Sequence, residues 1–108
     1  MRDPVGAVFA ALADPSRRYV VETLAARGSA TPTELADELP VTRQAVTKHL
    51  ASLRAAGLVR SERQGRETRY ELDPSPLADA TGWIARVGAQ WDERLAALTR
   101  HVADPGDR

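Results

Sequence analysis

Hydrophobic residues recur every three or four positions through the first half of the chain, which is the spacing of helices with one buried face. Together with its turn and capping residues, this pattern predicts four short helices, at about residues 4–13, 14–28, 31–40 and 42–56. Thr31 to Glu34 have the sequence of a capping box, in which the threonine hydroxyl and the glutamate carboxylate each accept a backbone amide. The buried face of the fourth helix is expected to carry Val46, Leu50 and Leu53.

Two short strands and one long helix should follow. Residues 58–63 and 68–72 are expected to pair as a hairpin around Gln64 to Glu67, where Gly65 is able to take a positive φ. The last helix should run from Pro76 to about Val102, and residues 103–108 are expected to fray. Its apolar positions include a set spaced seven residues apart, which is typical of a helix that packs lengthwise on another helix. These are Leu77, Ile84, Trp91 and Leu98.

The predicted fold class is mainly α with a small β-hairpin, in the order α-α-α-α-β-β-α. This is the order of a winged helix-turn-helix, and the length of 108 residues fits one such domain, residues 1–108, with dimerisation helices at both ends. A homodimer is expected because a domain of this size cannot bury the apolar stripes of its first and last helices on itself. The predicted interface residues are Val5, Val8, Phe9, Leu12, Ile84, Val87, Trp91, Leu95 and Leu98.

Charge is distributed unevenly along the chain. The formal net charge is zero, but seven basic and two acidic residues between Arg43 and Arg69 give that stretch a charge of +5. A localised basic stretch on a neutral protein indicates a nucleic-acid partner. Arg60, within this stretch, is instead expected to pair with Glu62 or Glu71 on the sheet.

The fourth helix is expected to enter the major groove of double-stranded DNA, whose width of about 12 Å accepts a helix. Its exposed face would carry groups suited to base edges and phosphates, and the arginines near the hairpin tip would contact the DNA backbone or the minor groove. The predicted DNA-binding residues are Thr42, Arg43, Gln44, Thr47, Lys48, Arg63, Arg66 and Arg69.

Five strings of residues follow one another in order between residues 11 and 70: Ala11 to Arg18, Glu34 to Ala36, Thr42 to Leu50, Leu53 to Val59 and Gly65 to Tyr70. Together they resemble the ArsR-type family of bacterial regulators. The resemblance implies a dimeric repressor that binds an inverted-repeat operator near its own promoter. It also implies that the first and last helices build the dimer interface.

No metal or other cofactor is expected. Metal-sensing members of the resembled family place cysteines in the helix before the turn, whereas this chain has no cysteine and carries Glu34 to Leu39 there. Other members bind zinc through aspartate and histidine pairs on the last helix. Here His101 is the single histidine of that helix, and the carboxylates of Asp79 and Asp92 are scattered, so that four converging ligands are not supplied.

Two alternative functions compete with DNA binding. A winged-helix module can bind protein instead of DNA, and salt-sensitive binding to a duplex would separate these two hypotheses. An enzyme is not expected, because the sequence shows no nucleophile paired with a base and no glycine-rich phosphate loop. No apolar run approaches the ~20 residues of a membrane span, so the chain is expected in the cytoplasm. The sequence does not identify a small-molecule effector.

Overall fold

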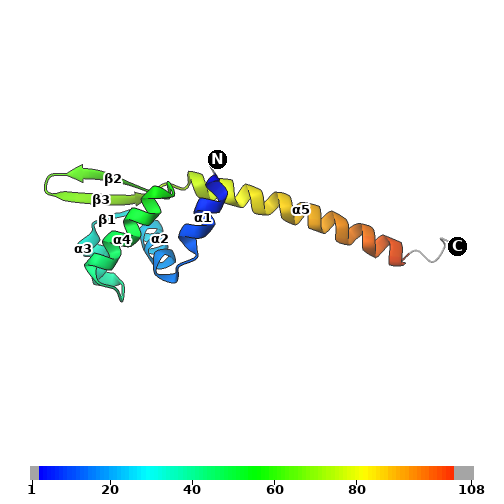
Figure 1. Ribbon diagram of the computed structural model, residues 1–108, viewed down its shortest axis with the longest axis horizontal. Coiled ribbons are helices and arrows are strands. Elements are labelled where there is room, and N and C mark those ends of the chain that lie inside the picture. Colours follow the sequence, from blue (N-terminus) through cyan, green and yellow to red (C-terminus); the bar gives the residue numbers. More distant parts are fainter. Residues whose placement is uncertain (1–2, 104–108) are drawn as a thin grey trace.

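The computed structural model describes residues 3–103, which form helices around a small antiparallel sheet (Figure 1). The elements are α1 (Pro4–Leu12), α2 (Pro15–Arg27), β1 (Ser29–Ala30), α3 (Pro32–Glu38), α4 (Arg43–Ala55), β2 (Val59–Gln64), β3 (Glu67–Leu72) and α5 (Ser75–Ala103). The predicted mainly helical winged fold is confirmed, with each expected helix and strand within two residues of its predicted ends. The frayed tail was expected over residues 103–108. Ala103 is instead the last residue of α5, and residues 104–108 lie outside the described range.

Local capping chemistry fixes where the helices begin and end. The predicted capping box is confirmed, since the Thr31 hydroxyl accepts the Glu34 amide at 3.1 Å and the Glu34 carboxylate accepts the Thr31 amide at 2.8 Å. The Thr42 hydroxyl accepts the Ala45 amide at 3.1 Å and so starts α4. Gly28 ends α2 with a φ of 88°, which residues with a side chain rarely adopt.

The strand β1 is absent from the sequence-based prediction. It has only two residues, too few for an alternating pattern to appear in the sequence. Ser29 lies opposite Glu71 and Ala30 opposite Tyr70, so β1 adds to the free edge of β3 and the strand order is β1-β3-β2. This pairing brings the end of α2 and the start of α3 beside the hairpin.

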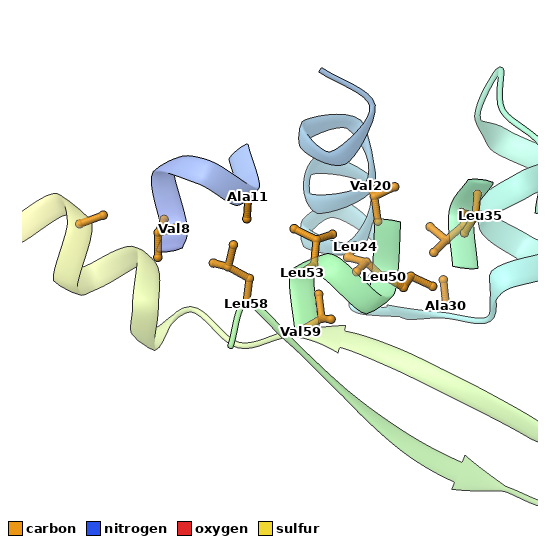
Figure 2. Packing of buried hydrophobic residues seen from close by; sticks show 12 residues of the cluster. Val8, Ala11, Val20, Leu24, Ala30, Leu35, Leu50, Leu53, Leu58 and Val59 are labelled. Carbon is orange, nitrogen blue, oxygen red and sulfur yellow. The ribbon is translucent and has the colours of Figure 1, made fainter. Parts of the chain in front are cut away.

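The core lies where α1, α2, α3 and α4 meet the base of the sheet (Figure 2). The predicted buried face of α4 is confirmed, because Val46, Leu50 and Leu53 are all fully buried. Because this face is turned inward, the opposite face of α4 is held toward solvent. The buried hydrophobic residues are Val8, Ala11, Val20, Leu24, Ala30, Leu35, Val46, Leu50, Leu53, Leu58, Val59 and Ala80.

The helix α5 leaves the rest of the molecule as a long arm, on the side opposite to the hairpin (Figure 1). The molecule is therefore elongated, with extents of 76 × 31 × 22 Å. The first turns of α5 pack on α1 and bury Ala80, whereas every residue from Trp83 to Val102 is exposed. No helix in the described part of the chain is long and apolar enough to cross a membrane.

Candidate nucleic-acid interface

The exposed face of α4 carries five of the predicted DNA-binding residues. All five side chains are exposed, and four of them, together with Ala45, line a surface hollow of about 630 Å³. A hollow at the first turns of a helix-turn-helix recognition helix is where base edges are reached. The five residues are Thr42, Arg43, Gln44, Thr47 and Lys48.

Two threonines of this face already use part of their hydrogen-bonding capacity. The Thr47 hydroxyl donates to the Arg43 carbonyl at 3.0 Å, which leaves its methyl group and acceptor lone pairs for a ligand. The Thr42 hydroxyl accepts the Ala45 amide as the helix cap, and its own O–H remains as a donor. Thr47 is thus suited to a thymine methyl group and Thr42 to a phosphate oxygen.

A second hollow joins α4 to the wing, the hairpin formed by β2, β3 and the turn between them. It measures about 520 Å³. Arg43 and Thr47 line it from α4, and Arg66 and Thr68 line it from the hairpin. The start of α3, residues 31–34, forms its remaining wall. The fold therefore brings residues of the fourth helix and of the wing, which the sequence predicted separately, to one concave surface.

The turn of the wing presents Arg66 and holds Arg63. Gly65 has a φ of 64°, which confirms the positive φ expected for this glycine. The Arg63 Nε donates to the Gly65 carbonyl at 2.9 Å and so braces the turn. Arg66 is exposed, and its side chain makes no hydrogen bond or ion pair with another residue of the range 3–103.

Arg69 differs from the other two wing arginines, because its guanidinium contacts residues outside the hairpin. Its side chain is 23% exposed, and its Nη2 lies 3.1 Å from the carboxylate of Glu34 on α3. Its Nε donates to the Ser29 hydroxyl at 3.3 Å, and its Nη1 lies 3.5 Å from Glu67. Sequence reasoning missed this arrangement, because Glu34 and Ser29 are far from Arg69 along the chain.

Arg60 pairs with Glu71, one of the two partners expected for it. The Arg60 Nε lies 2.6 Å from the Glu71 carboxylate, and the two residues face each other across β2 and β3. The alternative partner, Glu62, lies opposite Arg69 in the same register.

Sequence reasoning also missed the role of two arginines at the start of α2. Arg17 donates to the carbonyls of Ala11 at 2.6 Å and Ala10 at 3.1 Å, and Arg18 donates to the Leu12 carbonyl at 2.6 Å. These carbonyls lie in the last turn of α1, where positive charge is favoured. The signal was present as two arginines just after a helix end. The contacts fix α1 to the helix-turn-helix unit.

Asp14 completes this corner between α1 and α2. Its carboxylate accepts the Ser16 amide at 2.8 Å and caps α2. This hydrogen bond, with the Arg17 amide and guanidinium also nearby, holds the pKa of Asp14 below its usual value.

The predicted dimer-interface residues fall into three groups. Val8 is fully buried in the chain's own core, so it offers no surface to a second copy, and its prediction is corrected. It faces inward because α1 packs on α5 through this side (Figure 2). Val5 and Leu12 are half-buried. The remaining members are between 41% and 59% exposed: Phe9, Ile84, Val87, Trp91, Leu95 and Leu98.

The described residues gather no set of metal ligands. Within residues 3–103, no three histidine, aspartate or glutamate side chains lie close enough together to hold an ion. His49 is half-buried on α4, and His101 is exposed near the end of α5.

Both the sequence and the fold are similar to those of known transcriptional regulators. A family model described as a helix-turn-helix domain matches residues 12–62. The HTH-type transcriptional regulator Rv2034 of Mycobacterium tuberculosis is 39% identical over 97 residues, covering 90% of this chain and 87% of that protein. The arsenical resistance operon repressor of Escherichia coli is 30% identical over 96 residues, covering 89% and 82%. A solved ArsR-like transcriptional regulator from Rhodococcus sp. RHA1 superposes with a TM-score of 0.80 at 42% identity, over 93% of this chain and 92% of that one.

Proposed function

The chain belongs to the ArsR family of winged helix-turn-helix transcriptional regulators, and we propose that it acts as a homodimeric repressor on an inverted-repeat operator. In this proposal α4 enters the major groove of each half-site, and the wing contacts the adjacent backbone or minor groove. One of the similar proteins, from Escherichia coli, is named as a repressor, which supports repression rather than activation.

The observation that carries the DNA-binding part is the hollow of about 520 Å³ between α4 and the wing. Arg43 lines it from α4 and Arg66 from the wing, so two cations face a single concave surface. Glu34 and Glu67 line it as well, and both carboxylates are paired with Arg69. A phosphate backbone is the ligand that favours such an arrangement, since each strand presents regularly spaced negative charges.

The residues of α4 divide into two roles. Gln44 and Thr47 lie at the first turns of the helix, where base edges come within reach, and a glutamine amide pairs with adenine. Lys48 and Arg43 supply charge for phosphates. The amides at the start of α4 add donors for a phosphate oxygen, because a helix leaves its first amides without partners inside the helix.

The exposed stripe of α5 supports the homodimer. Ile84, Val87 and Trp91 recur eleven residues later as Leu95, Leu98 and Val102, and all six are exposed in the single chain. A period of eleven residues is close to that of a straight helix, so the stripe stays on one side along the arm. A second copy packed along this stripe would bury it and place the two α4 helices symmetrically, as an inverted repeat requires.

Selection of bound sequences from a random pool of duplexes tests this function directly. We expect enrichment of a sequence with two inverted half-sites whose centres are about one helical turn apart. Failure to enrich any duplex, with the protein folded and the salt concentration low, would contradict the proposed function.

A further inference from the structure

We propose that Arg69 is a positioning residue for the wing, and that it acts on DNA binding through its ion pair with Glu34 rather than by touching DNA. This inference rests on the proposed use of the wing in DNA binding. From the sequence alone, Arg69 is expected among the residues that contact DNA. The structure assigns it a different role, because each nitrogen of its guanidinium is directed to a partner within the chain.

The three partners of Arg69 lie on three different segments. The Nε donates to Ser29 on β1, the Nη2 pairs with Glu34 on α3, and the Nη1 lies near Glu67 in its own hairpin. A planar guanidinium holds such a set of partners in a fixed geometry, which a lysine ammonium would not reproduce. Arg69 therefore ties the wing to β1 and to the start of α3.

Glu34, the ion-pair partner of Arg69 on α3, is itself held in place by two other residues. One carboxylate oxygen accepts the Thr31 amide in the capping box at 2.8 Å, and the other lies 3.2 Å from the Arg27 guanidinium. The Thr31 amide, with Arg69 and Arg27, lowers the pKa of Glu34, so the carboxylate stays charged at neutral pH. Because Arg27 and Thr31 already hold this carboxylate, the Glu34 side chain loses little further conformational freedom when Arg69 pairs with it.

The ion pair between Arg69 and Glu34 lies at the edge of the hollow proposed to receive DNA. Glu34 lines that hollow on the α3 side, and Arg66 and Glu67 line it on the wing side. The helix α4 contacts β2 of the wing directly, and α3 also packs on α4. The pair of Glu34 and Arg69 therefore adds a second connection between the wing and α4, through α3. Releasing the pair would leave both DNA-binding surfaces intact but would loosen the geometry between them.

Charge alone predicts the opposite effect for one variant, and this makes the inference testable. Glu34→Gln removes a negative charge beside the hollow, which by simple electrostatics should tighten DNA binding. A glutamine at this position still accepts the Thr31 amide, so the capping box is kept. If Glu34 acts by positioning the wing, the same substitution should weaken binding instead.

The experiment measures the affinity of the wild-type protein, Glu34→Gln, Arg69→Gln and the double variant for the selected operator and for a random duplex, over a series of salt concentrations. Each single variant should bind the operator about fivefold more weakly, and the double variant no more weakly than either single one, because the two residues act as one unit. Glu38→Gln is the matched control. Glu38 pairs with Arg27 but not with Arg69, and its variant changes the net charge equally.

The expected result is a loss of operator affinity in Glu34→Gln that is absent in Glu38→Gln, with an unchanged salt slope. Two results would overturn the inference. One is a Glu34→Gln protein that binds as tightly as Glu38→Gln or more tightly. The other is an Arg69→Gln protein whose salt slope becomes shallower by about one unit for each phosphate no longer neutralised, as expected if Arg69 binds phosphate directly.

Folding and function are kept separate by two further measurements. If Glu34→Gln unfolds at the assay temperature, Arg69→Lys replaces it, since that variant keeps both the charge and the capping box. Weakened operator binding by Arg69→Lys supports the inference, and wild-type affinity overturns it, because a lysine would preserve a simple phosphate contact. A wild-type protein that binds no duplex would instead contradict the proposed function itself.

Discussion

The aromatic rings of Phe9 on α1 and Trp83 on α5 meet edge to face, with their centroids 5.7 Å apart and an interplanar angle of 71°. Aromatic pairs favour this geometry, because the positive edge of one ring approaches the negative face of the other. Both residues are still more than 40% exposed. The contact therefore orients α5 on α1 but leaves an apolar surface that continues along the arm of α5.

We expect the protein to be a dimer at micromolar concentration, because the arm of α5 has no partner along its apolar stripe in the single chain. Trp91 lies in the middle of this stripe and is 59% exposed. Trp91→Ala should weaken the dimer by about 3–5 kcal/mol, the usual cost of truncating a large aromatic that is buried. Analytical ultracentrifugation measures both the mass of the wild-type protein and the dissociation constant of the variant.

Glu93→Ala is the control for this prediction. Glu93 lies about 200° around the helix from Trp91 and is also exposed in the single chain. Its variant should dimerise like the wild type. A monomeric wild-type protein, or equal effects of the two substitutions, would contradict an interface along the stripe.

DNA affinity should fall steeply with salt. If Arg43, Lys48 and Arg66 of each subunit neutralise phosphates, a dimer makes six such contacts. At about −0.9 per contact, log K against log salt should have a slope of about −5 to −6. Titration of a labelled operator at several salt concentrations measures this slope. A nearly flat dependence would favour a module that binds protein instead.

Acid should destabilise the protein partly through Asp14. The pKa of Asp14 is lowered in the folded chain, first by the Ser16 amide. The charged carboxylate therefore stabilises the fold at pH values above the usual aspartate pKa, and this stabilisation is lost as the pH falls through about 4 and below. Asp14→Asn keeps a capping side chain but removes the charge. The thermal unfolding midpoint of Asp14→Asn should therefore be lower than that of the wild type at pH 7, and the difference should shrink as the pH falls below about 4. A gap independent of pH would contradict this role for the charge.

Much of the fold follows from local sequence. The spacing of Val46, Leu50 and Leu53 predicted which face of α4 is buried, and so which face is exposed. Capping residues such as Thr31 and Thr42 fixed where helices begin, because their hydrogen bonds reach only three residues along the chain. These features could be predicted because periodicity and capping are properties of neighbouring residues.

Features that depend on distant contacts could not be predicted. The strand β1 forms only because β3 offers it an edge, and two residues carry no periodicity. The ion pair of Arg69 with Glu34 could not be predicted, because the two residues are remote in the sequence. The inward direction of Val8 depends likewise on where α5 packs. In each case the deciding contact is set by the tertiary fold.

The spacing of the two half-sites should matter as much as their sequence. A dimer joined through α5 holds its two α4 helices at a fixed separation, so both reach their half-sites only on one face of the duplex. Inserting about five base pairs between the half-sites turns one of them about half a turn away. Operator affinity should then fall by about a thousandfold, toward that of random DNA. The same insertion outside the operator is the control, and equal affinity for both duplexes would contradict a rigid dimer.

The roles given to α4 and the wing can be separated by two substitutions. Gln44→Ala should cost about 1–3 kcal/mol on the selected operator and little on random DNA, as expected when a side chain that reads a base is removed. Arg66→Ala should weaken both duplexes by similar factors and make the salt slope shallower by about one unit for each phosphate no longer neutralised. Competition binding with both duplexes, repeated at several salt concentrations, gives these quantities.

Arg54→Ala is the matched control for the loss of charge. Arg54 lies exposed in the last turn of α4, and it lines neither of the two hollows. Its variant loses the same charge as Arg66→Ala, so only a general electrostatic effect should remain. If Arg54→Ala and Arg66→Ala weaken binding equally, Arg66 makes no specific contact.

If Gln44→Ala weakens binding to both duplexes while Arg66→Ala changes the preferred sequence, the two surfaces have been assigned in reverse. If Gln44→Ala and Arg66→Ala both leave binding unchanged, then DNA is bound elsewhere than at α4 and the wing.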